Sequence, residues 1–235
     1  MNLKKYVPNF LTLLNLFCGC IALVFVADLN FKFAFFFVAL GIFFDFFDGF
    51  FARKFSVAGP LGVQLDSLAD MVTSGVAPGF LMFCLLSHHN FYGYNFVPYF
   101  GFIITLGACY RLAKFNIDTR QSELFIGLPT PANTLFFMSL PLIDWNMLEF
   151  ITFNGTTFTA VLLFLCALSA YIMNAEIPLF SLKIKNFSIA KYKLQLLFVT
   201  SAMFLVLFLG YLGVAVTIVL YVVLSVFNNL FKIKK

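Results

Sequence analysis

Long apolar runs separated by short polar stretches dominate this chain of 235 residues. A helix needs about 20 consecutive apolar residues to cross the hydrocarbon core of a bilayer. Runs of roughly this length lie at 8–28, 32–52, 66–87, 96–113, 131–147, 155–175, 192–209 and 211–230. The fifth is short and proline-rich, and only "LGYLG" separates the last two. The pattern predicts about eight transmembrane helices, of which the last two form a hairpin with a tight turn.

Composition supports a membrane protein and excludes a soluble one. Hydrophobic residues make up 62% of the chain, 36 residues are Phe, and the mean hydropathy is +0.99. A globular protein of this size has too little interior to hide so much apolar surface. We therefore expect an all-α, polytopic membrane protein whose residues 1–235 form a single integral membrane domain.

The basic residues predict the orientation of the helices. All 15 except Lys32 fall in stretches that a chain of eight helices places on one side of the membrane. Positively charged loops stay in the cytoplasm, so both termini are expected there, with the protein in the cell (inner) membrane. Six helices stay possible if two runs are re-entrant or interfacial. The net charge of +5 follows this topology and does not indicate nucleic acid as a partner.

Four of the ten acidic residues fall within 26 positions at the junction of the second and third runs. Asp45 and Asp48 are three residues apart, and Asp66 and Asp70 are four apart. Both spacings place side chains on one face of a helix. Two antiparallel helices, joined by a loop with Gly59, Pro60 and Gly62, are expected to aim both pairs at one point near the cytoplasmic surface.

Four carboxylates at the edge of a membrane need positive charge nearby, because a buried carboxylate in a membrane helix costs about 3 kcal/mol. Carboxylate oxygens suit Mg²⁺ or Mn²⁺, and four aspartates suffice for two such ions. Gly49 and Ala52 leave room for a ligand, and Arg53 is placed to meet a phosphate. Two other interpretations stay open: Asp66 caps the third helix, or one pair relays ions in a transporter.

The acidic pattern D-x-x-D-G-x-x-A-R, followed after eight residues by G-x-x-x-D-x-x-x-D, resembles the signature of the CDP-alcohol phosphatidyltransferases. Its residues here are Asp45, Asp48, Gly49, Ala52, Arg53, Gly62, Asp66 and Asp70. The resemblance implies a core of six helices, about 8–175, followed by the C-terminal hairpin, about 190–231, and a homodimer. It implies two divalent cations held by the aspartates, Asp70 as general base, and the glycines with Arg53 at the nucleotide and diphosphate.

Further stretches narrow the resemblance within the family. "VPNFLTLLNLFCGCIA", "QLDSLADMVTSGVAP", "RLAKFNI" and "FIGLPTPAN" are similar to the phosphatidylserine synthases of bacteria and archaea. The implied reaction transfers the phosphatidyl group of CDP-diacylglycerol to the hydroxyl of L-serine and releases CMP. Direct in-line displacement is expected, and a covalent intermediate stays open. The alternatives are the same chemistry with glycerol 3-phosphate or inositol phosphate and, more remotely, an ion-coupled transporter.

Several polar residues outside the acidic pattern are candidates for substrate contacts. Arg111 is expected to bind the serine carboxylate, with Lys114 and Asn116 as further candidates, although all three also suit a positively charged cytoplasmic loop. Thr12 and Asn15, one turn apart, are expected at the nucleotide or its phosphates, or in hydrogen bonds between helices. The proline-rich "GLPTPAN" is expected to interrupt the helix and shape the cavity.

Overall fold

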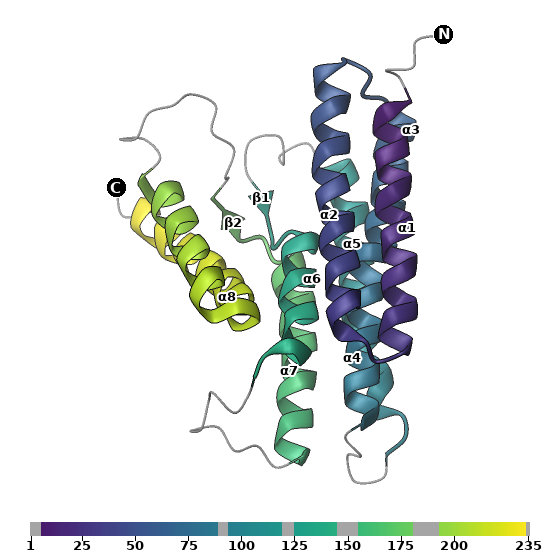
Figure 1. Cartoon of the computed structure of the whole chain (residues 1–235). Coiled ribbons are helices and arrows are strands. Elements are labelled where there is room, and N and C mark those ends of the chain that lie inside the picture. Colours follow the sequence, from purple (N-terminus) through teal and green to yellow (C-terminus); the bar gives the residue numbers. More distant parts are fainter. Residues whose placement is uncertain (1–5, 89–93, 119–124, 145–154, 181–192, 234–235) are drawn as a thin grey trace.

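The computed structural model describes residues 6–88, 94–118, 125–144, 155–180 and 193–233, and they form an all-α fold as predicted. Figure 1 shows a bundle of long helices with a hairpin beside it. The helices are α1 (Val7–Ala27), α2 (Phe31–Lys54), α3 (Pro60–Asp70), α4 (Ala77–His88), α5 (Ile103–Ile117), α6 (Thr130–Ser139), α7 (Gly155–Asn174) and α8 (Lys193–Ile233). Two short antiparallel strands, β1 (Phe125–Ile126) and β2 (Pro178–Leu179), pair with each other.

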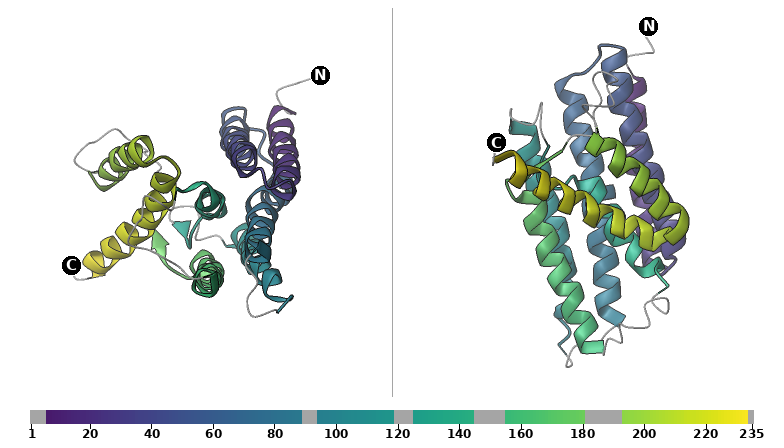
Figure 2. Two further views of the ribbon diagram at one scale, coloured as in Figure 1. Left: turned by 60° about the horizontal axis from the view of Figure 1, so that its bottom comes forward. Right: turned by 90° about the vertical axis from the view of Figure 1, so that its left-hand side faces the viewer.

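Helix α1 packs against α2 and α3, and α5 packs against α7 and against the segment Met71–Val76 that follows α3. Helix α6 contacts α2 and α4 on one side and α8 on the other. The α8 hairpin lies outside α6, on the side away from α1, and runs obliquely across the bundle (Figures 1 and 2). The α2–α3 connection, β1 and β2 all lie toward the same end of the bundle (Figure 1). This end carries the acidic residues.

The start of the third helix differs from its expected position. The third helix begins at Pro60 rather than at 66, because proline suits the first helical position and Gly59 precedes it as N-cap. Asp66 therefore lies inside α3, and its interpretation as a helix cap is wrong. Pro60 and Gly62 likewise belong to the helix rather than to the loop.

The fourth and fifth runs form shorter α-helices than expected. A 3-10 turn, Val97–Phe102, precedes α5, which extends beyond the predicted end to Ile117. Helix α6 gives way to a 3-10 turn at Leu140–Leu142, where Pro141 removes a backbone donor. As expected, "GLPTPAN" interrupts helical structure: Gly127 has φ of 74°, and α6 starts only at Thr130.

Within the described residues, five helical stretches are long and apolar enough to cross a membrane. They are Val7–Ala27, Phe31–Lys54, Pro60–His88, Gly155–Asn174 and Leu194–Leu230. The last contains the predicted hairpin turn, because Gly210 has φ of 55° and ψ of −125°. Glycine adopts this left-handed conformation without the steric cost that a Cβ brings. The protein is thus an integral membrane protein of several helices.

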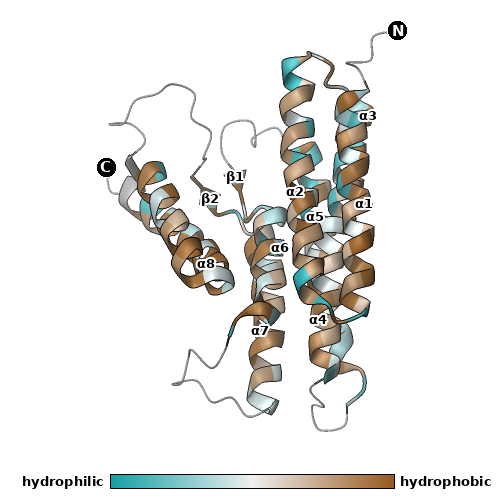
Figure 3. Cartoon of the chain, in the orientation of Figure 1, coloured by the Kyte–Doolittle hydropathy of each residue, from teal (hydrophilic) through white to brown (hydrophobic). Residues whose placement is uncertain are grey.

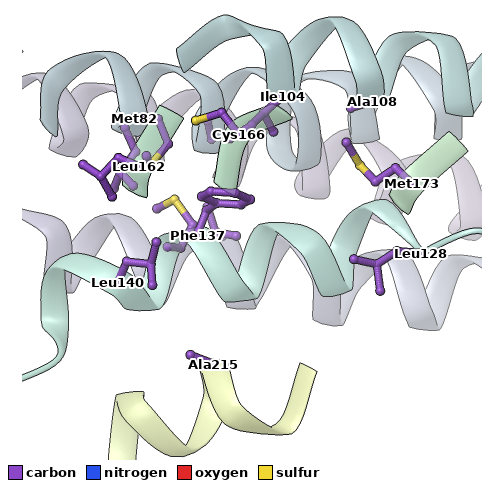
Figure 4. Packing of buried hydrophobic residues seen from close by; sticks show 14 of the residues in the cluster. Met82, Ile104, Ala108, Leu128, Phe137, Leu140, Leu162, Cys166, Met173 and Ala215 are labelled. Atoms are coloured by element: carbon purple, nitrogen blue, oxygen red, sulfur yellow. The ribbon is translucent and has the colours of Figure 1, made fainter. Parts of the chain in front are cut away.

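Apolar residues cover both the outside and the interior of this fold. Figure 3 shows hydrophobic residues along the sides of the helices, as expected for surfaces that face lipid. Phe17, Phe43 and Phe208 are examples of large exposed rings. In the interior, the ring of Phe137 from α6 faces side chains of α4, α5 and α7 (Figure 4) and is fully buried. Helix α6 therefore anchors the core.

A π-helical segment, Met71–Val76, interrupts the long helix between α3 and α4 directly after Asp70. Its wider turn changes the backbone hydrogen bonding, and neighbouring threonines supply donors. Thr134 donates to the Ser74 carbonyl at 2.8 Å, and Thr105 donates to the Gly75 carbonyl at 2.9 Å. Such segments concentrate at functional sites. Here the segment is fixed by α5 and α6.

Candidate active site

Three of the four aspartates meet between α2 and α3. One carboxylate oxygen from each of Asp45, Asp48 and Asp66 lies within 4.8 Å of the other two. Asp45 and Asp48 share a face of α2 because they are three residues apart, and α3 runs back past this face after the short connection at 55–59. The predicted convergence of acidic residues from two helices is confirmed for these three.

The three carboxylates suit a divalent cation. Two oxygens that bind one Mg²⁺ or Mn²⁺ at about 2.1–2.5 Å are at most about 4–5 Å apart, which matches the spacing here. Oδ1 of Asp66 is buried and has no hydrogen-bond partner among the described residues. A bound cation would satisfy this oxygen and offset the repulsion among the three charges. The donors are all hard oxygen ligands, as such ions prefer.

Asp70 lies one turn further along α3 and is only 8% exposed. Its Oδ1 accepts a hydrogen bond at 3.1 Å from the Asn15 amide of α1. Its charge interacts with those of Asp45, Asp66 and Arg111. Asp70 therefore belongs to the same electrostatic site, in a layer deeper than the three clustered carboxylates.

Two side chains of helix α1 donate hydrogen bonds to the acidic residues. The Thr12 hydroxyl donates to Oδ2 of Asp48 at 2.6 Å, as the Asn15 amide does to Asp70. Both α1 side chains are buried. These two residues were expected either at the nucleotide or in hydrogen bonds between helices. In the structure both donate hydrogen bonds to other helices, and the acceptors are the aspartates. Such contacts orient carboxylates that bind a metal and fix their positions.

Two hollows adjoin the acidic cluster. The larger is a cavity of about 730 Å³ between α2, α3, α5, α6 and α8. The smaller, about 190 Å³, lies between α1, α2 and the start of α3. Both are lined by Asp48, Gly49, Arg53 and Asp66. The cluster thus stands where a substrate bound across both hollows would place its reacting group.

Most of the residues expected at the nucleotide line the smaller hollow. Its lining includes Thr12, Gly49, Ala52, Arg53 and Gly62. The Arg53 guanidinium lies over Gly49, where an added Cβ would be 3.3 Å from Nη1. The missing side chain at position 49 therefore lets this arginine fold back toward the cluster.

The three candidates for the serine carboxylate differ in their partners. Arg111 is buried, and its Nε and Nη2 have no hydrogen-bond partner within the described part of the chain. Lys114 pairs with Glu176 at 3.6 Å, and Asn116 exchanges hydrogen bonds with Ser67. Of the three candidates, Arg111 therefore has buried N–H donors that a ligand could accept from.

Sequence reasoning missed the contribution of the C-terminal hairpin to the site. Phe198, Ile218 and Tyr221 of α8 line the larger cavity, as does Phe115 of α5. Nothing in the sequence pattern distinguishes them, because each stands in an apolar run or beside one. The spacing of the aspartates predicted only the part of the cavity wall that α2 and α3 form.

These features define a helical membrane protein with a cluster of carboxylates that could hold a cation, beside a cavity toward one end of its bundle. The sequence model of the CDP-alcohol phosphatidyltransferase family matches residues 5–173, and the chain belongs to this family. The match ends at the close of α7, so the α8 hairpin lies beyond it.

Several relatives carry the name CDP-diacylglycerol–serine O-phosphatidyltransferase. The Bacillus subtilis protein is 37% identical over 54% of this chain and 70% of its own length. A Helicobacter pylori protein is 29% identical over 80% of this chain and 76% of its own. The Methanocaldococcus jannaschii protein is 34% identical over 56% of this chain and 58% of its own. The resemblance inferred from the sequence is confirmed.

Proposed function

We propose that this protein transfers the phosphatidyl group of CDP-diacylglycerol to the hydroxyl of L-serine, giving phosphatidylserine and CMP. The observation that carries the proposal is the convergence of Asp45, Asp48 and Asp66 at the boundary of two hollows. The names of the relatives support serine as the acceptor.

Asp45, Asp48 and Asp66 would hold divalent cations, Mg²⁺ or Mn²⁺, with Asp70 completing the set for a second ion. When bound, such ions neutralise the diphosphate and stabilise the departing CMP. Thr12 keeps Asp48 in the orientation that the site needs through its hydrogen bond. Arg53, with Gly49, Ala52 and Gly62, would bind the nucleotide and diphosphate in the smaller hollow.

Asp70 would act as the general base for serine. A serine hydroxyl is a weak nucleophile at neutral pH, and a carboxylate within hydrogen-bond reach can take its proton during attack. Asn15 holds one oxygen of Asp70, and Arg111 stabilises the negative charge of Asp70 electrostatically. The unpaired donors of Arg111 would bind the serine carboxylate, because guanidinium and carboxylate match as bidentate partners. Asn116 and Lys114 would support this pocket through Ser67 and Glu176.

The direct test is CMP release from CDP-diacylglycerol by purified protein, with serine and Mg²⁺ or Mn²⁺. Asp70→Asn is expected to lower turnover by about 100-fold or more, as loss of a general base does. Asp28→Asn is the matched control, because Asp28 is exposed at the opposite end of α1. Substantial turnover in Asp70→Asn would remove the general-base role, and native protein that is inactive with serine would overturn the proposal.

The same assay separates the acceptors. Glycerol 3-phosphate and inositol phosphate each carry a phosphate and need several clustered cations. Lys114 is paired with Glu176, which leaves Arg111 as the buried cation with unpaired donors among the described residues. Serine is therefore expected to support faster CMP release than either phosphate-bearing alcohol. An ion-coupled transporter would release no CMP at all.

We also propose that the acidic end of the bundle faces the cytoplasm in the cell (inner) membrane, with both termini on that side. Arg53 and Lys54 close α2 at this end, and Lys32 lies at its other end. The homodimer implied by the family resemblance and the single domain expected from the composition are part of the proposal. Light scattering of the detergent-solubilised protein tests the dimer, and a monomeric mass would exclude it.

A further inference from the structure

The α8 hairpin forms one wall of the larger cavity, although it lies beyond the part of the chain that matches the family. Phe198 comes from its first helix, and Ile218 and Tyr221 come from its second. The opposite wall carries Asp45, Asp48 and Asp66. The hairpin and the acidic cluster therefore face one shared space.

Tyr221 is fixed in this wall by its contacts. It is 7% exposed, and its ring packs edge-on against Phe180, with the centroids 4.9 Å apart. Phe198 completes the aromatic cluster, with its ring centroid 5.4 Å from that of Tyr221. The Tyr221 hydroxyl donates to the Phe180 carbonyl at 3.0 Å. An aromatic ring held on two sides and by its hydroxyl is a rigid wall rather than a mobile side chain.

The same helix holds the segment that leads into the cavity. Asn229 donates to the Pro178 carbonyl of β2, and Tyr221 donates to the carbonyl of Phe180 directly after it, so α8 holds this segment through two side chains. Strand β2 pairs with β1, which continues through Gly127 to the cavity residue Pro129. Gly127 lies so close to Met173 that an added Cβ would clash with its backbone. The hairpin thus fixes the connection at 125–129 from outside.

In-line displacement suggests which hollow receives the lipid-linked donor and which receives the acceptor alcohol. In-line displacement places the attacking and leaving oxygens on opposite sides of phosphorus. The smaller hollow holds the residues proposed for the nucleotide, so CMP leaves on the side of α1. The acceptor must then approach from the larger cavity, whose far wall is α8.

Phe115 connects this cavity with the group proposed for the acceptor's carboxylate. The Arg111 guanidinium stacks on Phe115, 5.7 Å from the ring centroid, and Phe115 lines the cavity as Tyr221 does. Two aromatic rings, Phe115 from α5 and Tyr221 from α8, therefore line the space from which the acceptor is proposed to approach Arg111.

We propose that Tyr221 is a specificity-determining residue for the acceptor alcohol, and that its ring on the α8 hairpin limits the length of the amino acid that reaches Arg111 and the acidic cluster. The inference rests on the proposed function for the identity of the acceptor. Its physical basis is the rigid ring at the acceptor side of the cavity. A pocket bounded by apolar rings discriminates by size, at about tenfold or more for each methylene group.

The test compares L-serine with L-homoserine, which is one methylene longer and keeps the primary hydroxyl, the ammonium and the carboxylate. CMP release is measured for the native protein, Tyr221→Ala and Tyr221→Phe, with KM values for each alcohol and for CDP-diacylglycerol. Phe208→Ala is the matched control, because it removes an exposed ring from the same hairpin.

Tyr221→Ala is expected to raise the ratio of kcat/KM for homoserine over serine by about tenfold. Its KM for serine should rise by a similar factor while its KM for CDP-diacylglycerol stays within about twofold. Tyr221→Phe keeps the ring and should restore the native ratio, and Phe208→Ala should match the native protein.

An unchanged ratio in Tyr221→Ala, or equal losses for both alcohols and the donor, would overturn the inference. If Tyr221→Ala is not recovered from membranes, Tyr221→Leu takes its place, and an unchanged ratio there overturns the inference equally. Native protein that is inactive with serine would instead contradict the proposed function, so the two failures are distinguishable.

Discussion

At the scale of single residues, the acidic cluster depends on neutral neighbours that fix its charges. Asp48 and Asp70 each accept a hydrogen bond from α1, from Thr12 and Asn15 respectively. Carboxylates that repel one another would otherwise turn apart in the absence of a cation. The α1 side chains therefore hold the site in a geometry ready for a metal ion.

Thr12→Val tests this role, because it removes the hydroxyl and keeps the shape of the side chain. We expect the Mg²⁺ or Mn²⁺ concentration that gives half-maximal CMP release to rise by about tenfold, as losses of such supporting contacts do. Thr200→Val is the control, since Thr200 is exposed on α8 and donates only within its own helix. Equal metal dependence in Thr12→Val and the control would show that the hydroxyl does not support the site.

At the scale of elements, α1 packs closely against the π-helical segment that follows Asp70. This packing fixes the position of Asp70 relative to α1. A Cβ added at Gly19 would lie 3.0 Å from Cα of Thr73 and still closer to its hydroxyl. Thr73 in turn donates to the Asn15 carbonyl at 3.1 Å. A small residue at position 19 therefore lets the two helices approach, as is common between membrane helices.

Gly19→Ala is expected to separate α1 from this segment and to destabilise the fold by about 1–3 kcal/mol, the usual cost of overpacking. Thermal unfolding in detergent should show a lower Tm, together with reduced CMP release because the Asn15–Asp70 contact is disturbed. Gly155→Ala is the matched control, since nothing lies within 4 Å of a Cβ added there. A Gly19→Ala protein with native Tm and activity would contradict this packing argument.

The sequence predicted those elements whose cause is local. The spacing of the aspartates predicted the meeting that Asp45, Asp48 and Asp66 show, and "LGYLG", which contains Gly210, predicted the hairpin turn. The early start of α3 was missed because Pro60 and Gly62 also suit a loop, although proline is equally suited to the first turn of a helix. The π-helical segment and the placement of Tyr221 depend on contacts between segments far apart in the chain, which spacing does not encode.

At the scale of the whole molecule, the acidic site lies toward one end of an apolar bundle. The aspartates, the β1–β2 pair and the start of α6 gather there, while exposed Phe and Leu side chains cover the helix sides (Figure 3). This separation lets a lipid-linked substrate keep its acyl chains in the bilayer while its diphosphate reaches the carboxylates. The hairpin completes the enclosure beside α6.

The proposed orientation predicts that reporters fused to either terminus report the cytoplasm. Green fluorescent protein at the C-terminus should fluoresce, and alkaline phosphatase at the same position should be inactive, because lysine-rich ends are retained on the inner side. Fusions after His88, at the other end of α4, should give the reverse pattern. Active alkaline phosphatase at the C-terminus would contradict the proposed topology.

The most direct measurement of the central claim is equilibrium binding of Mn²⁺ to the purified protein, followed by electron paramagnetic resonance. The native chain is expected to bind Mn²⁺, and Asp48→Asn or Asp66→Asn is expected to weaken binding by about tenfold or more, because each substitution removes a charged ligand. Asp28→Asn, at the far end of the bundle, should bind as the native protein does. Undiminished Mn²⁺ binding in both cluster variants would contradict the claim that these carboxylates hold the cation.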